Sequence, residues 1–351
     1  MEVNQLKSLL SRFGIKPNKF LGQNFLLSDE VLDDIVAAAD LKSSDTVLEI
    51  GPGLGALTQR LAAKAGEVIA VEKDRALAAV LRKFFKNKKN VKIVQGDALW
   101  LDSSVIPGLT RDPEDKELDS RLRGNDKQRV GYKLVANIPY YITGKLLQNF
   151  LTPSQSPPMA YTGGEGEPFS PSRREGGDEE GVRSRPSLMV LLLQKEVAER
   201  IVAKPGDMSI LAVSVQFYAD PEIISYVPRE NFYPVPEVDS AVVRLKVLDR
   251  PRFDVDEKKF FQFVKIGFSS KRKQLQNNLI AGLPAITPAF GGGLYKRDLD
   301  SRLRGNDRGE SGNDRDGMKN ILDSLSLNPL CRAEDLSIGD WKRLYDRIFN
   351  F

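Results

Sequence analysis

Four consecutive residues, Asn137-Ile138-Pro139-Tyr140, carry groups that could hold a flat base by an exocyclic amine. The Asn137 side-chain oxygen and the Ile138 carbonyl could both accept hydrogen bonds from the NH₂, placing its nitrogen for attack without a strong base. Pro139 would stiffen the turn, and Tyr140 would stack on the base. Taken alone, an ordinary Asn-x-Pro turn beside a core aromatic explains these residues better. The acceptor interpretation therefore depends on a cofactor site elsewhere in the chain.

Such a site is indicated by the segment EIGPGLG at residues 49–55, which lies between an apolar strand pattern and a helical pattern. Glycines in this position let a ligand approach the backbone closely. Glu72 closes the next predicted strand, where a carboxylate can accept both ribose hydroxyls. Asp97 closes the third strand, where it could accept from an adenine amino group. Each acid could instead cap a helix or lie at a solvated strand end, but sites at three successive strand ends favour a nucleoside cofactor.

The spacing of the glycines selects among nucleoside cofactors. The pattern is Glu-x-Gly-x-Gly-x-Gly rather than the Gly-x-Gly-x-x-Gly of dinucleotide folds, and the sequence has no Gly-x-x-x-x-Gly-Lys-Ser/Thr phosphate loop. S-adenosylmethionine fits best. Together with the amine-binding residues, this predicts methyl transfer to adenine.

Composition excludes several other chemistries. The sequence has no histidine and one cysteine, Cys331, so His-based acid–base catalysis, Cys–His nucleophiles, an internal disulfide and the common zinc sites are excluded. We predict no metal. The net charge of +4 describes a modestly basic protein that suits a polyanionic partner. No signal peptide or membrane span is visible, which predicts a cytoplasmic protein.

These residues must be positioned by a regular alternation of strand and helix patterns. The alternation predicts an α/β fold with a mainly parallel, doubly wound sheet covered on both faces. Together with the expected S-adenosylmethionine site, this sheet leads us to predict the Rossmann-like fold of class I S-adenosylmethionine-dependent methyltransferases. From about Val255 onward the pattern is wholly helical. We therefore predict a methyltransferase domain at residues 1–254 and a small all-α domain at 255–351. The predicted elements are helices at 29–41, 56–65 and 75–87, strands at 46–51, 67–74, 91–99 and 132–140, a strand running into a helix at 187–203, and further elements at 210–219 and 240–248.

Three segments, 103–131, 154–186 and 287–317, interrupt this pattern. They are rich in Gly, Pro, Ser, Arg and Asp, and the nonapeptide LDSRLRGND occurs identically at 118–126 and 299–307. We predict disordered inserted loops. An Arg-rich RNA-binding arm is the alternative, but the charges in these segments are balanced or acidic rather than basic.

Several motifs resemble one family, the bacterial KsgA/RsmA-type small-subunit ribosomal RNA adenine N6,N6-dimethyltransferases. The resemblance covers almost the whole chain outside the three segments, and those segments depart from the family pattern. It rests on KFLGQNFL at 19–26, EIGPGLGALT at 49–58, NIPYYIT at 137–143, LLLQKEVAERIVAKPG at 191–206, NFYPVPEVDSAVVRL at 231–245, FSSKRKQLQNNL at 268–279 and RAEDLSIGDWKRL at 332–344.

The resemblance implies a set of cofactor residues. The N-terminal segment would close over the cofactor, Glu72 would take the ribose, and Asp97 with Ala98 would take the adenine. The cofactor-binding residues expected are Gln23, Asn24, Leu26, Glu49, Gly51, Gly53, Glu72, Asp97, Ala98 and Asn137.

The resemblance also implies the acceptor and partner. Phe232 in NFYPVP resembles the aromatic that sandwiches the target base against Tyr140, with core packing beside Pro234 as the alternative. The catalytic residues expected are Asn137, Ile138, Pro139, Tyr140 and Phe232. The family's substrate is a pair of adjacent adenines in a hairpin loop near the 3′ end of 16S rRNA in the 30S subunit, where unpaired bases are splayed at low cost. The run Lys271, Arg272 and Lys273 is a candidate phosphate contact, and a monomer is expected.

Three alternatives stay open. The related enzymes that dimethylate an adenine in 23S rRNA and confer macrolide resistance share the cofactor loop and the acceptor motif. A ribosome-assembly checkpoint that binds pre-30S particles, with methylation secondary, is compatible with the same residues. DNA adenine methylation is disfavoured because the sequence shows no target-recognition domain.

Overall fold

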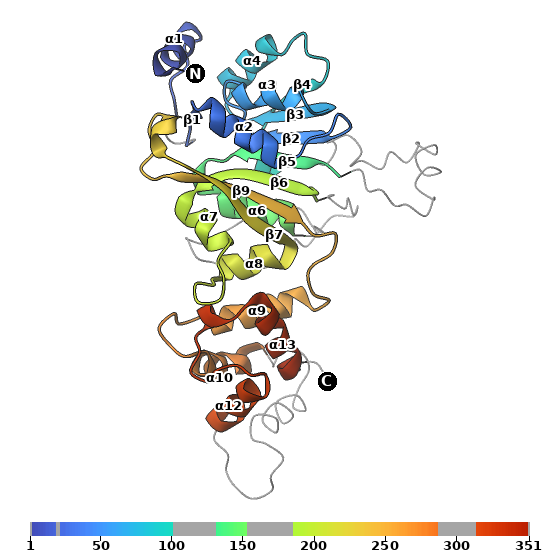
Figure 1. Ribbon diagram of the computed structural model, residues 1–351, viewed down its shortest axis with the longest axis vertical. Coiled ribbons are helices and arrows are strands. Elements are labelled where there is room, and N and C mark those ends of the chain that lie inside the picture. Colours follow the sequence, from blue (N-terminus) through green and yellow to red (C-terminus); the bar gives the residue numbers. More distant parts are fainter. Residues whose placement is uncertain (1, 19–21, 101–130, 153–184, 287–313, 350–351) are drawn as a thin grey trace, which may run out of the picture. The chain divides into compact units, whose positions relative to one another are not determined.

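The computed structural model describes residues 2–18, 22–100, 131–152, 185–286 and 314–349 (Figure 1). Within these residues the chain forms two compact units. The first contains residues 2–18, 22–100, 131–152, 185–199 and 219–249, and the second contains 200–218, 250–286 and 314–349. The second unit thus takes in residues 200–218 as well as the helical C-terminal part. The predicted domain boundary at residue 254 stays a prediction.

A seven-stranded sheet in the order β4-β3-β2-β5-β6-β9-β7 forms the first unit (Figure 1). The first five strands in this order are parallel, whereas β9 pairs antiparallel with both β6 and β7. This confirms the predicted mainly parallel sheet. The strands are β2 Thr46–Ile50, β3 Glu67–Glu72, β4 Val91–Gln95, β5 Lys133–Asn137, β6 Leu188–Gln194, β7 Ala219–Val227 and β9 Ser240–Val247, and a separate pair is formed by β1 Phe25–Leu26 and β8 Phe232–Tyr233.

The central strands are apolar runs because helices cover both faces of a parallel sheet. Val47, Leu48, Leu134 and Val135 are all fully buried. In the register of the sheet, Ile50 of β2 lies opposite Val71 of β3 and Ala136 of β5. The residues that follow β2, β3 and β5 therefore emerge together at the carboxyl edge of the sheet, where ligands bind in such folds.

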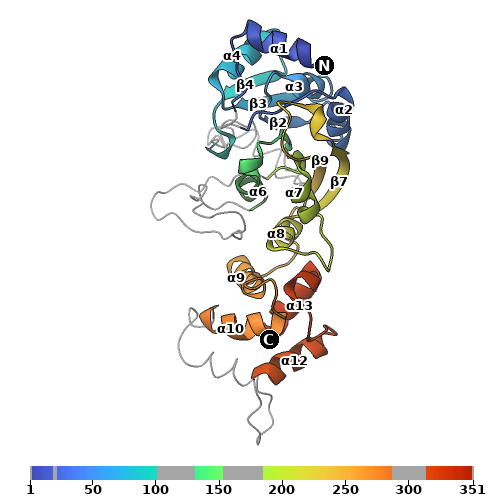
Figure 2. The same ribbon diagram turned by 90° about the vertical axis from the view of Figure 1, so that its left-hand side faces the viewer.

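Helices α1 Val3–Arg12, α2 Asp29–Ala38, α3 Ala56–Ala62, α4 Arg75–Phe84 and α6 Thr143–Leu151 belong to the first unit, and α7 Lys195–Ile201 lies at its boundary. The hydroxyl of Ser28 caps α2 by accepting from the Val31 N–H. Helix α1 was not predicted. Its Leu6 and Leu10 pack in one apolar cluster with Leu77 and Val80 of α4, and Figure 2 shows the two helices side by side.

The second unit is helical, as predicted from Val255 onward. Its helices are α8 Ile210–Tyr218, α9 Glu257–Gly267, α10 Leu275–Ile286, α12 Asp314–Ser324 and α13 Ile338–Phe349. Aromatic contacts join α8, α9 and α13: Phe260 packs on Phe217 with ring centroids 5.2 Å apart, and Phe263 meets Trp341 edge to face.

One predicted segment boundary is wrong. Helix α12 begins at Asp314, so residues 314–317 are helical rather than part of an inserted loop at 287–317. These residues form the first turn of a helix whose Met318 and Leu322 are fully buried, and that burial anchors the turn. The remainder of that segment, and nearly all of the segments 103–131 and 154–186, lies outside the described residues.

Among the helices of the described residues, none is long and apolar enough to cross a membrane. The same residues contain no group of three or more His, Cys, Asp or Glu side chains arranged to hold a metal ion.

Candidate active site

A cavity of about 1260 Å³, including its open mouth, lies at the carboxyl ends of the parallel strands. The predicted site residues that line it are Gln23, Asn24, Leu26, Glu49, Gly51, Gly53, Glu72, Asp97, Ala98, Asn137, Ile138, Pro139 and Phe232. The side chain of Tyr140 lies outside what the structure describes. Lys271, Arg272 and Lys273 belong to the second unit, where all three are exposed.

The glycine loop after β2 takes a backbone path that other residues rarely adopt. Gly51, Gly53 and Gly55 have φ values of +71°, +60° and +86°. A Cβ at Gly53 would lie 3.3 Å from the Phe25 ring, and one at Gly55 would lie 2.6 Å from the Phe85 ring. The glycines thus serve both the left-handed turn and close packing on the cofactor side.

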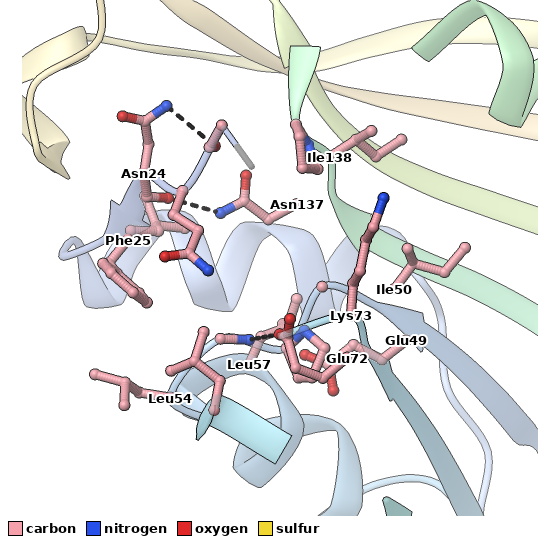
Figure 3. Close-up of a pocket in the computed structure, with 18 of the residues that line it drawn as sticks. Asn24, Phe25, Glu49, Ile50, Leu54, Leu57, Glu72, Lys73, Asn137 and Ile138 are labelled. Atoms are coloured by element: carbon pink, nitrogen blue, oxygen red, sulfur yellow. Dashed lines mark hydrogen bonds between the residues drawn. The ribbon is translucent and has the colours of Figure 1, made fainter. Parts of the chain in front are cut away.

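Glu72 is held by the same loop. Its carboxylate accepts hydrogen bonds from the Gly53 N–H at 3.2 Å and the Asp74 N–H at 2.8 Å, and Figure 3 shows its contact with the loop. Burial raises the pKa of Glu72, while the backbone hydrogen bonds lower it. The carboxylate is fixed in orientation and keeps lone pairs for further donors.

Glu49 has an unusual environment for an acid. It is 1% exposed, and neither of its carboxylate oxygens has a hydrogen-bond partner among the described residues. Burial raises the pKa of Glu49 to about 8, and the nearby Glu72 adds to the rise. The nearby Thr58 hydroxyl lowers the pKa of Glu49 somewhat, although its geometry does not meet the criteria for a hydrogen bond to the carboxylate. Two buried acids beside one cavity suit a ligand that presents a positively charged group, such as an ammonium.

Asp97 already has partners. Its carboxylate pairs with the Lys73 ammonium at 3.0 Å and accepts from the Leu99 N–H at 3.0 Å. The Asp97 carboxylate also raises the pKa of Lys73. The Asp97 side chain is therefore fixed in position at the cavity wall, with lone pairs left for an additional donor.

The N-terminal segment, residues 22–26, forms one wall of the cavity. The Gln23 side chain donates to the Asp74 carboxylate at 3.2 Å and accepts from the Asn18 N–H at 2.8 Å. Asp74 in turn caps α4 by accepting from the Ala76 and Leu77 N–H groups. The segment is thus fastened to the start of the helix that follows Glu72.

Asn137 closes β5 next to this wall. Its side-chain NH₂ donates to the Asn24 carbonyl at 3.3 Å (Figure 3). Because the amide nitrogen is engaged there, the side-chain oxygen is the group left to accept from a ligand. Phe232 reaches the same cavity from β8, which pairs with β1. Phe232 is 2% exposed and packs in the main core cluster, so it serves core packing as well as lining the cavity.

Sequence reasoning missed several residues of this cavity. Leu6 of α1 lines it, and the spacing of Leu6, Leu9, Leu10 and Phe13 could have revealed that helix. Lys73, directly after Glu72, and Tyr141, which is 57% exposed, also line it. Their types carry no distinctive signal, because exposed lysines and tyrosines are common on surfaces.

Comparisons with known proteins agree with this geometry. The family profile described as ribosomal RNA adenine dimethylase matches residues 14–287. The chain is 36% identical over 341 residues to ribosomal RNA small subunit methyltransferase A of Dehalococcoides mccartyi strain CBDB1, covering 97% of this chain and 91% of that relative. It is 40% identical over 304 residues to the protein of the same name from Pelotomaculum thermopropionicum, covering 86% and 90%.

Two solved structures have the same fold. A dimethyladenosine transferase from Plasmodium falciparum is similar with a TM-score of 0.62 and 24% identity over 91% of this chain and 95% of that chain. The 23S rRNA methyltransferase ErmE is similar with a TM-score of 0.60 and 22% identity over 93% of this chain and 99% of that chain. At these identities the likeness establishes the class I methyltransferase fold alone.

Proposed function

The chain belongs to the ribosomal RNA adenine dimethylase family and is a methyltransferase that uses S-adenosylmethionine, and from this premise we propose its target. The target is N6 of two adjacent adenines in the hairpin loop near the 3′ end of 16S rRNA, within the 30S subunit or its precursor. The enzyme acts as a cytoplasmic monomer and contributes to small-subunit biogenesis. The observation that supports this proposal is the orientation of the Asn137 side chain. Its amide nitrogen donates to the Asn24 carbonyl, so its oxygen can accept a hydrogen bond from the adenine amine.

S-adenosylmethionine supplies an electrophilic methyl group when bound. In our proposal Glu72 accepts the ribose hydroxyls, while Asp97 and the adjoining Ala98 receive the adenine. Glu49 compensates the positive charge of the amino-acid part. The backbone of Gly51 and Gly53 lies against the cofactor, and Gln23, Asn24 and Leu26 close over it. The positive φ of both glycines and the hydrogen bonds that fix Glu72 support this assignment.

At the acceptor, the Asn137 side-chain oxygen and the Ile138 carbonyl accept from the adenine NH₂. An exocyclic amine is a poor nucleophile because its lone pair is delocalised into the ring, so two acceptors that hold its hydrogens favour a more tetrahedral nitrogen. The same oxygens hold the hydrogen that the nitrogen would lose as a proton to solvent when it bonds to the methyl carbon and the bond from that carbon to the cofactor sulfur breaks. Positioning therefore supplies the catalysis in this proposal, and the absence of histidine from the sequence agrees with it.

The base itself lies between Tyr140 and Phe232 in this proposal, with Pro139 stiffening the turn. The rigid setting of Phe232 in the core would hold one face of the sandwich in place. The C-terminal helical domain, 255–351, binds rRNA, with Lys271, Arg272 and Lys273 as phosphate contacts. The relatives at 36% and 40% identity, which are named for the small subunit, support this target over 23S rRNA.

The test is incubation with tritiated S-adenosylmethionine and 30S subunits from a strain that lacks the modification, followed by nuclease digestion and nucleoside analysis. We expect N6,N6-dimethyladenosine in the 3′-terminal fragment of 16S rRNA. A folded, cofactor-binding protein that leaves 30S subunits unlabelled but labels 23S rRNA would overturn the proposed target.

A further inference from the structure

The positive charge of this protein is concentrated in one stretch. Residues 75–92 contain seven Lys and Arg and no Asp or Glu, whereas the other 333 residues contain 45 basic and 48 acidic side chains. Six of the seven lie at the end of α4, in the loop that follows and on β4. We call Arg82, Lys83, Lys86, Lys88, Lys89 and Lys92 the α4–β4 basic surface.

All six side chains of the α4–β4 basic surface are exposed. None of them forms an ion pair with a carboxylate within the described residues, although several basic residues elsewhere do. Arg60 pairs with Asp29 and Asp33, and Lys133 pairs with Asp45. The six charges therefore repel one another without local compensation, which destabilises the free protein slightly.

Structural roles account for only some of these residues. Arg82 and Lys83 lie in the last turn of α4, where cations favour the helix dipole. Lys92 is on β4, at the edge of the sheet, where lysine opposes strand association. Neither reason applies to Lys86, Lys88 and Lys89, which lie in the loop between the two elements.

That loop is held by backbone hydrogen bonds and by the Asn90 side chain, and its lysine side chains take no part. The Lys88 N–H donates to the Phe85 carbonyl at 2.9 Å, and the Val91 N–H donates to the Lys88 carbonyl at 3.3 Å. The Asn90 side chain donates to the carbonyls of Ala62 and Ala65. The lysines are thus presented from a loop of defined shape, and their removal leaves its supporting contacts in place.

The loop also adjoins the cofactor site and the N-terminal helix. Phe85, which precedes Lys86, packs against Gly55 of the glycine loop. The neighbouring Phe84 is 44% exposed and meets Phe13 edge to face, with ring centroids 5.5 Å apart. The guanidinium of Arg12 lies 5.8 Å from the centre of the Phe13 ring, so α1 adds positive charge beside two accessible aromatic rings.

We propose that the α4–β4 basic surface binds the phosphate backbone of the RNA substrate, at a site separate from the acceptor cavity. Exposed, unpaired lysines on a fixed loop are suited to phosphate contacts, which position an RNA without reading its sequence. The exposed Phe84 offers a stacking face for an unpaired base beside them. The inference rests on the proposed function for the identity of the RNA, which we take to be small-subunit rRNA.

The test compares the wild type with the variant K86Q/K88Q/K89Q for binding to deproteinised 16S rRNA and to unmodified 30S subunits over a range of salt concentrations. We expect the variant to bind both about tenfold more weakly at ~0.1 M salt, and the slope of log K against log salt to fall by about two to three. S-adenosylmethionine affinity should stay unchanged, and Tm should stay unchanged or rise slightly because three like charges are removed. K86R/K88R/K89R should restore binding because it keeps the charges.

A matched control removes three exposed lysines that are scattered over the chain, in K42Q/K204Q/K246Q, and should retain the wild-type salt slope. Equal losses in both triple variants would mean that only net charge matters and would overturn the inference, as would an unchanged slope in the loop variant. A loss seen with 30S subunits but not with naked 16S rRNA would assign the surface to a ribosomal protein instead. If the wild type binds unmodified 30S subunits through this loop but does not methylate their 16S rRNA, the proposed target fails while the surface stands.

Discussion

Glu49 is the residue whose charge is least compatible with its surroundings. It lies 1% exposed beside another buried acid, Glu72, and its oxygens have no hydrogen-bond partner among the described residues. Burial raises its pKa from 4.5 to about 8, so the free protein holds Glu49 protonated at neutral pH. A cationic ligand in the cavity would favour the carboxylate form, which couples cofactor binding to release of this proton.

The substitution Glu49→Gln should remove the fall in stability with rising pH that Glu49 causes, while Glu72, whose pKa burial also raises, keeps its own contribution. The unfolded chain releases the Glu49 proton near pH 4.5, whereas the folded protein keeps it up to about pH 8. The folded state therefore binds more protons in that window, and the free energy of unfolding of the wild type falls as pH rises through it. Glutamine mimics the protonated acid and has no such loss, so at pH 8 the variant should be more stable by a few kcal/mol.

Urea unfolding between about pH 5.5 and about pH 8.5 measures this difference. Asp33→Asn is the control, because Asp33 is an exposed acid whose side chain pairs with Arg60 outside the cavity. Parallel curves of unfolding free energy against pH for the wild type and Glu49→Gln would show that Glu49 is ionised in the free protein.

Asn137 should matter for the chemical step more than for binding. Asn137→Ala removes an acceptor for the target amine, and loss of one such positioned group lowers kcat by about 100-fold to 1000-fold. The affinity for S-adenosylmethionine should change only a few-fold, because Glu72 and Asp97 remain fixed by their own contacts. Single-turnover methylation and calorimetry measure the two effects. A variant that loses cofactor affinity in proportion to activity would place Asn137 with the cofactor alone.

At the scale of elements, the glycine loop and α4 depend on each other. Gly55 precedes α3 with φ at +86°. Its Cα faces a methyl group of Leu81 on α4 and the ring of Phe85, which directly follows α4. The loop can therefore keep its shape only while no side chain intervenes at this position. This packing connects the cofactor loop to the helix that carries the basic surface.

Gly55→Ala should destabilise the protein by about 2–4 kcal/mol, from left-handed backbone strain together with overpacking against Phe85. Gly14→Ala separates the two causes. Gly14 has a φ of +65° but has nothing within 4 Å of the added Cβ, so only the strain of about 1 kcal/mol should remain. Thermal unfolding with and without S-adenosylmethionine measures both variants. Equal shifts in Tm for Gly55→Ala and Gly14→Ala would show that α4 moves to make room for the added methyl group and that overpacking against Phe85 costs no stability.

The elements also show where sequence patterns suffice. Runs such as Leu188–Gln194 predict buried strands directly, and the acids at strand ends predict the cofactor site because parallel strands share a carboxyl edge. Long-range pairing is not visible in such patterns. No local sequence pattern predicts that Lys73 pairs with Asp97. Nor does one predict that the Phe25 ring lies so close to Gly53 that a side chain at this position would be crowded. Helix α1 has a helical pattern, but its contact with α4 and the cavity arises only in the folded chain.

At the scale of the whole molecule, the described residues on either side of the segment 154–184 are fixed by hydrogen bonds. Between α6 and β6, the Arg185 guanidinium donates to the carbonyls of Leu151 and Asp249 at 3.3 Å and 2.8 Å. The Ser187 N–H donates to the Tyr132 carbonyl at 2.9 Å. The chain thus leaves α6 and re-enters at Arg185 in adjacent places, so a short connection suffices there.

Replacing residues 154–184 by a Gly-Ser linker of about six residues should therefore leave the methylation rate of 30S subunits within about twofold of the wild type. The strand that bears Asn137 pairs with β6 over five register positions, Lys133 to Asn137, and none of these contacts involves the removed residues. The entropic cost of closing a loop depends only weakly on its length. Shortening this connection should therefore change Tm by a few degrees at most. Initial rates at limiting and saturating 30S subunits separate effects on docking from effects on chemistry. A large gain in rate at limiting subunits would show that the segment hinders docking of the rRNA, and a large loss would show that it contributes to that docking.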